Sequence, residues 1–256
     1  MKTTRRPATI TLVGAFALLT GAAAACHPRG EVAVVTTGGP SPIPRAAPAH
    51  DPGARAEVAP VPAVELRATH GSIRESRGFL AMRDPAIRAV APAAAPGEAE
   101  LRFVYQGPSE KTAPLASGEI RRQIGLKLRA QDGCNLVYVM WRIEPVQEIV
   151  VSVKRNPGKS THVECGAHGY TDVGTVQASL LRPLRVGEPH VLSARMEGDV
   201  LEVRSDGVNV WKGALGRDAL GFEGPVGLRS DNGKFDVVFS ARRSFRVASL
   251  AKLEDG

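Results

Sequence analysis

Apolar and polar residues alternate with a period of two through most of residues 98–242. Successive side chains of a β-strand point to opposite faces, so this alternation predicts strands that are buried on one face. About ten short strands in about 150 residues, with few helices, predict an all-β, two-sheet antiparallel sandwich or jelly roll. The expected strands include Leu101–Tyr105, Ile124–Leu128, Val137–Ile143, Ile149–Lys154, Val191–Met196, Val200–Arg204, Val208–Trp211, Val226–Leu228 and Phe235–Phe239.

Three short segments between these runs have the composition of tight turns. They are Gly198-Asp199, Asp206-Gly207 and Asp231-Asn232-Gly233. Hairpin turns often need a positive φ, which Gly, Asn and Asp adopt more readily than other residues. The sequence therefore predicts a hairpin at each of the three positions.

The rest of the chain has a different composition. Residues 27–97 hold 11 of the 19 prolines and a single aromatic residue, whereas residues 98–256 hold 10 of the 12 aromatic residues. Only residues 98–256 are expected to bury a core, and residues 26–97 are expected to form a Pro/Ala-rich tether. Within that tether, Ser72–Met82 has the spacing of a capping box and is interpreted either as a short helix or as ordinary linker.

The first 25 residues are expected to form a signal peptide. Basic residues precede an apolar run over 10–19 and small residues over 21–25, which are the three regions of a secretory signal. Ala23-Ala24-Ala25-Cys26 fits an ordinary cleavage site and also resembles a bacterial lipoprotein box. Cys26 is therefore expected to carry lipid and anchor an exported protein to a bacterial membrane, on the periplasmic side or at the cell surface. The alternative is a secreted protein with Cys26 free or in an intermolecular bridge.

Cysteine usage supports lipidation of Cys26. The chain has three cysteines, so a disulfide between Cys134 and Cys165 would leave one odd thiol outside the cytosol. Lipid on Cys26 removes that thiol. A zinc site formed by Cys165 with His162 and His168 is the less favoured alternative, and we expect neither a metal nor a cofactor.

Two stretches resemble a known superfamily. Gly125–Asp132 followed by Asn135–Val139 resembles a strand pair of concanavalin A-like, laminin-G-like jelly rolls, and residues 187–230 are similar to the second half of that fold. The resemblance implies a sugar-binding type of sandwich over most of residues 98–242. Since the superfamily includes lectins, adhesion modules and glycoside hydrolases, it leaves the activity open.

Strand parity selects a candidate ligand-binding face. If the apolar residues of three strands face the core, then Arg129, Tyr138, Arg142 and Lys154 share the opposite face. An aromatic ring among cationic donors suits a sugar or an envelope polymer, because the ring can stack on a pyranose while Arg and Lys bind hydroxyl or carboxylate groups. The alternative is a solvated sheet face covered by long basic side chains.

A catalytic site is not expected. The segment Glu197–Glu202 matches the acidic motif of jelly-roll β-glucanases, but a hairpin at Gly198-Asp199 is expected to make the two glutamates diverge. The net charge of +7 is spread over the whole chain, so nucleic acid is not an expected partner. We therefore expect a noncatalytic envelope lipoprotein that binds carbohydrate. The alternatives are a hydrolase resembling 3-keto-disaccharide hydrolases and a structural or protein-adhesion module.

Overall fold

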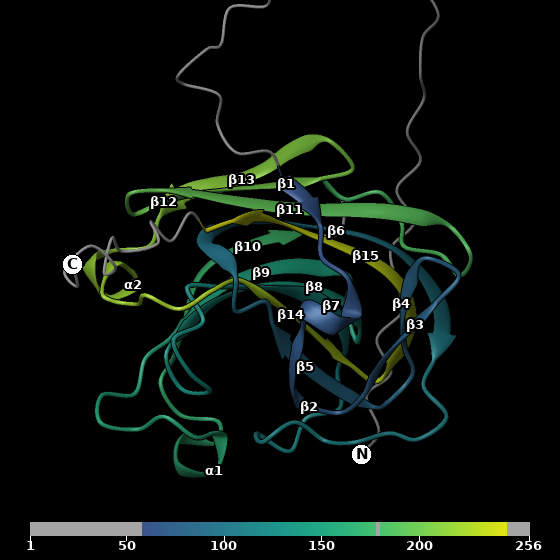
Figure 1. Cartoon of the computed structure of the whole chain (residues 1–256), viewed down its shortest axis with the longest axis horizontal. Coiled ribbons are helices and arrows are strands. Elements are labelled where there is room, and N and C mark those ends of the chain that lie inside the picture. Colours follow the sequence, from purple (N-terminus) through teal and green to yellow (C-terminus); the bar gives the residue numbers. More distant parts are fainter. Residues whose placement is uncertain (1–57, 178–179, 245–256) are drawn as a thin grey trace, which may run out of the picture. The chain divides into compact units, whose positions relative to one another are not determined.

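The computed structural model describes residues 58–177 and 180–244, whose strands form two antiparallel sheets packed on each other (Figure 1). Sheet A has the strand order β13-β12-β11-β6-β15-β4-β3, with β1 also paired to β15. Its strands are β1 (Val58–Pro60), β3 (Ile73–Ser76), β4 (Phe79–Met82), β6 (Ala94–Pro108), β11 (Pro189–Glu197), β12 (Val200–Ser205), β13 (Val208–Ala214) and β15 (Gly233–Arg243).

Sheet B has the order β10-β9-β8-β7-β14-β5-β2. Its strands are β2 (Arg67–His70), β5 (Ala86–Val90), β7 (Arg122–Leu128), β8 (Leu136–Glu144), β9 (Glu148–Lys154), β10 (Tyr170–Gln177) and β14 (Gly227–Asp231). The helices of the described residues are η1 (Ala63–Glu65), α1 (His162–Cys165) and α2 (Arg217–Leu220), none of them long enough to cross a membrane. The predicted all-β two-sheet sandwich is confirmed.

The core lies between the inner faces of the two sheets, and strand parity places it correctly. All seven residues predicted to face inward on β7, β8 and β9 belong to it: Leu126, Leu128, Val137, Val139, Trp141, Val151 and Val153. Phe103 of sheet A meets the edge of Trp141 of sheet B, with 5.7 Å between ring centroids, and Phe103 also packs on Phe235 at 6.1 Å. The contact between Phe103 and Trp141 joins the two sheets, and Phe235 extends the aromatic cluster within sheet A.

The expected start of the domain at residue 98 is wrong. Five strands, β1 to β5, precede it, and β4 and β5 lie inside the sheets rather than at their edges. Met82, Ile87 and Ala89 on these strands are completely buried. Small residues such as Ala89 are enough to fill the core where strands lie close together, so the low aromatic content of this segment does not mean that it lacks a core.

Ser72–Met82 is neither helix nor linker. It forms the β3–β4 hairpin, whose turn residues Arg77 and Gly78 have φ values of 52° and 78°. The expected capping residue Ser72 instead donates from its backbone N–H and its hydroxyl to Asp84 Oδ2, both at 2.7 Å. A hairpin pairing with β15 buries Leu80 and Met82, which an isolated short helix would leave exposed.

Two of the three predicted hairpins are confirmed. Gly198-Asp199 connects β11 to β12, and Asp206-Gly207 connects β12 to β13. The third prediction is wrong, because the strands on either side of Asn232 belong to different sheets. Asn232 has a φ of 55° and carries the chain from β14 of sheet B to β15 of sheet A.

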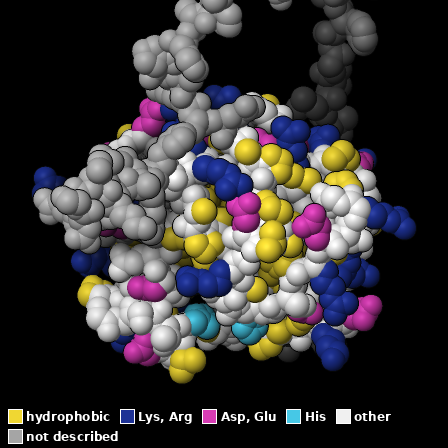
Figure 2. Space-filling model, viewed as in Figure 1, with side chains coloured by type: hydrophobic (Ala, Val, Ile, Leu, Met, Phe, Trp, Pro, Cys, Tyr) yellow, Lys and Arg dark blue, Asp and Glu magenta, His cyan; other side chains and the backbone are white. Residues whose placement is uncertain are grey.

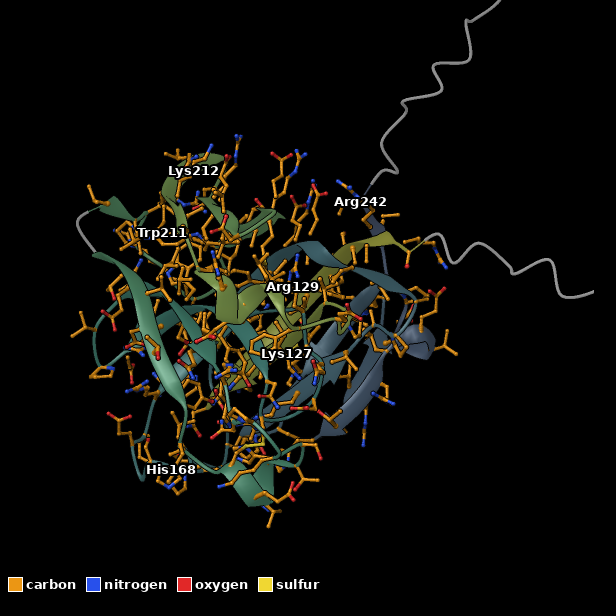
Figure 3. The ribbon with its side chains drawn as sticks, turned by 90° about the vertical axis from the view of Figure 1, so that its left-hand side faces the viewer. Lys127, Arg129, His168, Trp211, Lys212 and Arg242 are labelled. Carbon is orange, nitrogen blue, oxygen red and sulfur yellow. A yellow bond between two sulfur atoms is a disulfide. The ribbon has the colours of Figure 1, made fainter. Side chains whose placement is uncertain are left out.

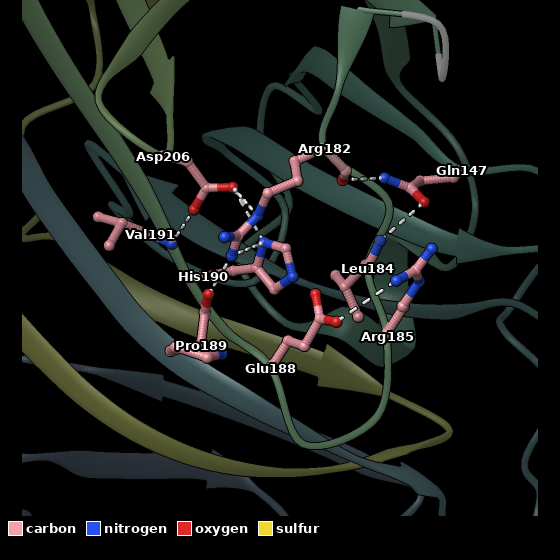
Figure 4. Close-up of polar contacts among 9 residues, drawn as sticks. All are labelled: Gln147, Arg182, Leu184, Arg185, Glu188, Pro189, His190, Val191 and Asp206. Atoms are coloured by element: carbon pink, nitrogen blue, oxygen red, sulfur yellow. Dashed lines mark hydrogen bonds and ion pairs between the residues drawn. The ribbon is translucent and has the colours of Figure 1, made fainter.

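A histidine is buried between the sheets in a polar cluster (Figure 4). His190 Nδ1 lies 3.0 Å from Asp206 Oδ2 and 3.1 Å from an Arg182 guanidinium nitrogen. The His190 ring also packs against the Trp141 ring, with 5.3 Å between centroids. Gln147 donates to the Arg182 carbonyl at 2.8 Å. This cluster joins the loop before β11 to the β12–β13 turn, and it gives the buried His190 Nδ1 its polar partners, while Nε2 of the same ring has none among the described residues.

Candidate functional site

A pocket of about 230 Å³ lies on the outer face of sheet B, the face turned away from the core. Pockets for drug-sized ligands are typically about 300–1,000 Å³, so this one suits a ligand of about one sugar-sized ring. Six of the seven strands of the sheet each supply at least one of its side chains, and two loops complete it. The strand residues that line it are Arg88, Gln123, Tyr138, Met140, Arg142, Val150, Ser152, Tyr170, Asp172 and Arg229.

Two tyrosine rings lie side by side in the pocket. Tyr138 of β8 and Tyr170 of β10 are stacked with 6.0 Å between centroids and an interplanar angle of 20°. Tyr138 is buried, and burial raises the pKa of its phenol to about 12, so the hydroxyl keeps its proton at neutral pH. The Tyr170 ring is 39% exposed. Tyr170 is thus the accessible ring of the pair, and the stacked Tyr138 ring supports it.

A buried carboxylate organises the cationic side of the pocket. Asp231 accepts from Arg88 at 3.1 Å, from Arg229 at 2.8 Å and from Gln123 at 2.7 Å. Its side chain is 1% exposed, so these bonds are little screened by water. The Arg229 guanidinium also lies over the Tyr138 ring, 5.1 Å from its centroid. Asp231 therefore fixes two guanidinium groups next to the aromatic pair.

One wall of the pocket is the loop around helix α1. His162, Gly166 and Ala167 of this loop line the pocket. Cys165 bonds to Cys134, just before β8, with 5.9 Å between Cα atoms, so the predicted disulfide is confirmed. Closing a loop of this length stabilises a fold by about 3–4 kcal/mol, and here it also fixes the pocket wall.

The opposite wall is the loop over 115–121, and Asn232 holds it in place. The Asn232 side chain accepts from the Ala113 backbone N–H at 2.8 Å and donates to the Ala113 and Arg121 carbonyls, both at 2.9 Å. The left-handed backbone of Asn232 turns its side chain toward this loop. The residue expected to form a hairpin turn is therefore a clamp that supports the pocket.

Two buried lysines lie under the same face of sheet B. Lys154 Nζ donates to the carbonyls of Gly166 at 2.9 Å and Gly133 at 3.3 Å, and lies 5.0 Å from the Tyr170 ring centroid. Lys127 is 4% exposed, and among the described residues it has no hydrogen-bond acceptor or ion-pair partner. Figure 3 labels Lys127 well away from Lys212, which is exposed on β13. Burial, followed by the charges of nearby arginines, lowers the pKa of Lys127 to about 7.

The structure brings together part of the predicted set. Tyr138 and Arg142 line the pocket, and Lys154 lies beneath it. Arg129 does not take part, because it follows the end of β7, has a φ of 47° and donates to the Leu220 carbonyl at 3.1 Å. Side chains alternate between the two faces of a sheet only within a strand, so parity could not assign Arg129 to a face.

Sequence reasoning missed the three residues at the centre of the site. Arg88 lies on β5, within the segment expected to be a tether, and Arg229 and Asp231 lie on β14. The alternating patterns of β5 and β14 do not show that these strands pair with each other and with β7. The local signal is weak: Arg229 and Asp231 lie two residues apart on β14, and Arg88 is the single charged residue of β5.

Glu197 and Glu202 do not diverge as expected. Both line a shallow groove on the outer face of sheet A, because β11 and β12 place them on the same side. Each carboxylate is in an ion pair, Glu197 with Arg195 and Glu202 with Arg204. The hydrogen bond from Arg204 lowers the pKa of Glu202. A retaining glycosidase needs one carboxyl group protonated, and the bond from Arg204 favours the ionised form of Glu202.

The zinc alternative is not supported in the described part of the chain. The sulfur of Cys165 is in the disulfide, and no group of three His, Cys, Asp or Glu residues among those described is placed to hold a metal ion. On the face shown in Figure 2, basic and acidic side chains are interspersed.

Comparison with known proteins shows the fold but no family. No protein-family model matches the chain, and no curated protein matches it. A carbohydrate-binding module from Bacillus subtilis is similar with a TM-score of 0.52 and 13% identity, over 70% of this chain and 96% of that one. The exoplasmic/lumenal domain of VIP36, in a Ca²⁺/Man3GlcNAc-bound form, has a TM-score of 0.49 and 14% identity over 72% and 85%. The first likeness supports the two-sheet jelly-roll fold and shows nothing beyond the fold.

Proposed function

We propose that this domain binds carbohydrate in the pocket on the outer face of sheet B and does not catalyse a reaction. The observation that carries the proposal is the stacked pair of Tyr138 and Tyr170, whose open ring lies among guanidinium and amide donors. A sugar offers an apolar ring face and polar edges, and this arrangement matches both. The fold is compatible, because the similar Bacillus subtilis structure is a carbohydrate-binding module.

The chemistry of the pocket favours binding over catalysis. The buried carboxylate of Asp231, next to the pocket, is bonded to three protein donors and does not itself line the pocket. Glu148 beneath the rim is bonded to Arg142 at 2.5 Å. Hydrolysis needs an acid and a base that can both exchange protons with the substrate. The ion pairs of this pocket instead position donors for a ligand.

Replacing Tyr170 by Ala is expected to weaken glycan binding at least about tenfold, since the open stacking surface is lost. The side chain is partly exposed, so the change should leave thermal stability nearly unaltered. Binding is measured by a glycan array followed by calorimetry on each glycan retained. The matched control is Phe79→Ala, an aromatic residue of similar exposure on β4 of sheet A, which should bind as the parent does. Equal binding by both variants would remove the tyrosine pair from the site.

We also propose that the protein is exported and anchored in a bacterial envelope through lipid on Cys26. Residues 1–25 and Cys26 lie outside the described residues, so the support is the signal-like sequence and the odd cysteine that remains beside the Cys134–Cys165 bridge. Mass spectrometry of the membrane-extracted protein should find an amino-terminal Cys26 carrying acyl chains. An unmodified chain beginning at Cys26 would contradict the anchor and leave export standing.

A further inference from the structure

The two arginines at the centre of the pocket have unused hydrogen-bond donors. Arg88 and Arg229 are directly opposite each other on β5 and β14, a pairing of like charges that costs stability. Each guanidinium has five N–H donors, and each gives one nitrogen to Asp231. Among the described residues no other acceptor lies within hydrogen-bond distance of either guanidinium. Both line the pocket, so their remaining donors are available to a ligand.

The surroundings of these arginines carry more positive than negative charge. Lys127 and Lys154 lie on the same sheet face, and Lys154 donates only to neutral carbonyls. The four basic residues are Arg88, Arg229, Lys127 and Lys154. Among the described residues, Asp231 is the single acid bonded to any of them. Arg142 is balanced by Glu148, and Asp172 is an exposed acid at the far side on β10. The low pKa of Lys127 is a consequence of burial and of the unbalanced charge of Arg88, Arg229 and Arg67.

We propose that the pocket takes an acidic sugar residue, whose carboxylate binds the free guanidinium donors of Arg88 and Arg229 while its ring lies against Tyr170. This rests on the proposed function and names the class of sugar. A neutral sugar could accept the same hydrogen bonds but would leave the excess positive charge in place. A carboxylate neutralises it, and its two oxygens match the planar fork of a guanidinium. The small volume suits one such residue in a longer glycan.

The first test is a glycan array that carries carboxylated, sulfated and neutral glycans, probed with the full-length protein. We expect the carboxylated glycans to be retained at least about tenfold more strongly than neutral glycans of the same backbone, because bonds to a charged acceptor are the stronger ones. Equal retention of neutral glycans, or a preference for sulfate over carboxylate, overturns this inference and leaves the proposed function standing. Retention of no glycan overturns the proposed function itself.

The second test uses substitutions and the best carboxylated glycan from the array. Arg88→Gln should reduce its affinity at least about tenfold while affecting a neutral glycan of the same backbone much less. Arg102→Gln is the matched control, an exposed arginine on β6 of sheet A that is paired with Glu100 across 2.7 Å. An Arg88→Gln variant that keeps its melting temperature and binds the acidic glycan as the parent does overturns the inference.

A third test measures the pH dependence of binding and needs no substitution in the pocket lining. An anion held near Lys127 raises the pKa of that lysine, so binding should take up protons, and affinity should fall as the pH rises from about 6 to about 9. Lys127 faces Tyr138 on β8 and the charges of Arg67, Arg88 and Arg229 on β2, β5 and β14. Lys154 and His162 titrate nearby and add to the same trend.

Calorimetry in two buffers of different ionisation enthalpy measures this proton uptake directly. Lys127→Met should remove most of it and bring the affinity at low pH down toward the value at high pH, while Lys154 and His162 leave a smaller pH dependence. Binding of the acidic glycan that neither takes up protons nor weakens with rising pH would overturn the inference. This result would stand even if Arg88→Gln proved too unstable to study.

Discussion

A chain that begins at residue 98 is expected not to fold, whereas a chain that begins at Pro52 is expected to fold as the full-length protein does. The shorter chain lacks β4 and β5, which pair with β15 and β14 and bury Met82 and Ile87 completely. Losing one such side chain costs about 2–5 kcal/mol. Losing several of them together with two strands exceeds the about 5–15 kcal/mol by which a typical domain is stable.

Circular dichroism and urea unfolding of the two chains check this expectation. The chain from Pro52 should show a cooperative transition, and the chain from residue 98 should show none. Limited proteolysis of the full-length protein should likewise yield a resistant fragment that still contains β1 to β5. A resistant fragment that starts near residue 98 would restore the tether interpretation of residues 58–97.

The sequence predicts the fold wherever one face of a strand is buried and the other is polar. Leu101, Phe103 and Tyr105 alternate with exposed or half-buried positions on β6, and the structure places all three in the core. The prediction fails where strands are short and their inward residues are small. Ala89 is as completely buried as Trp141, but an alanine in a Pro/Ala-rich segment carries no local sign of burial. Ala89 is buried by the strands that pack around it, and the order of those strands in the sheet cannot be read from the local sequence.

The site was partly predictable for the same reason. Parity correctly put Tyr138 and Arg142 on one face, because both lie within β8. It could not bring Arg88 next to Arg229, since 140 or so residues separate them and only the pairing of β5 with β14 joins them. Nor could it assign Asn232 as a loop clamp, because the same residue type and positive φ would also suit a hairpin. The alternation of polar and apolar residues does not reveal which distant strands pair with each other.

Replacing Lys127 by Met is expected to stabilise the protein, and the gain should depend on pH. In the folded protein the pKa of Lys127 is lowered to about 7, chiefly by burial, while in the unfolded chain it is near its ordinary value of 10.5. Between these two values the unfolded chain holds more protons, so the stability of the parent rises with pH across this window. Below about pH 7 the folded protein bears the full cost of a buried charge, on the order of 5 kcal/mol.

Methionine keeps a similar chain length without the charge, so Lys127→Met should be more stable by about that amount at about pH 6 and nearly equal to the parent at about pH 10. Urea unfolding at the two pH values measures the difference. Lys111→Met, at an exposed position, is the control and should change stability by less than about 0.5 kcal/mol at either pH. A gain of the same size at both pH values would mean that the charge of Lys127 is not its cause. The variant could be more stable and also have lost affinity for acidic glycans. Lys127 would then lower the stability of the fold while its positive charge contributes to ligand binding.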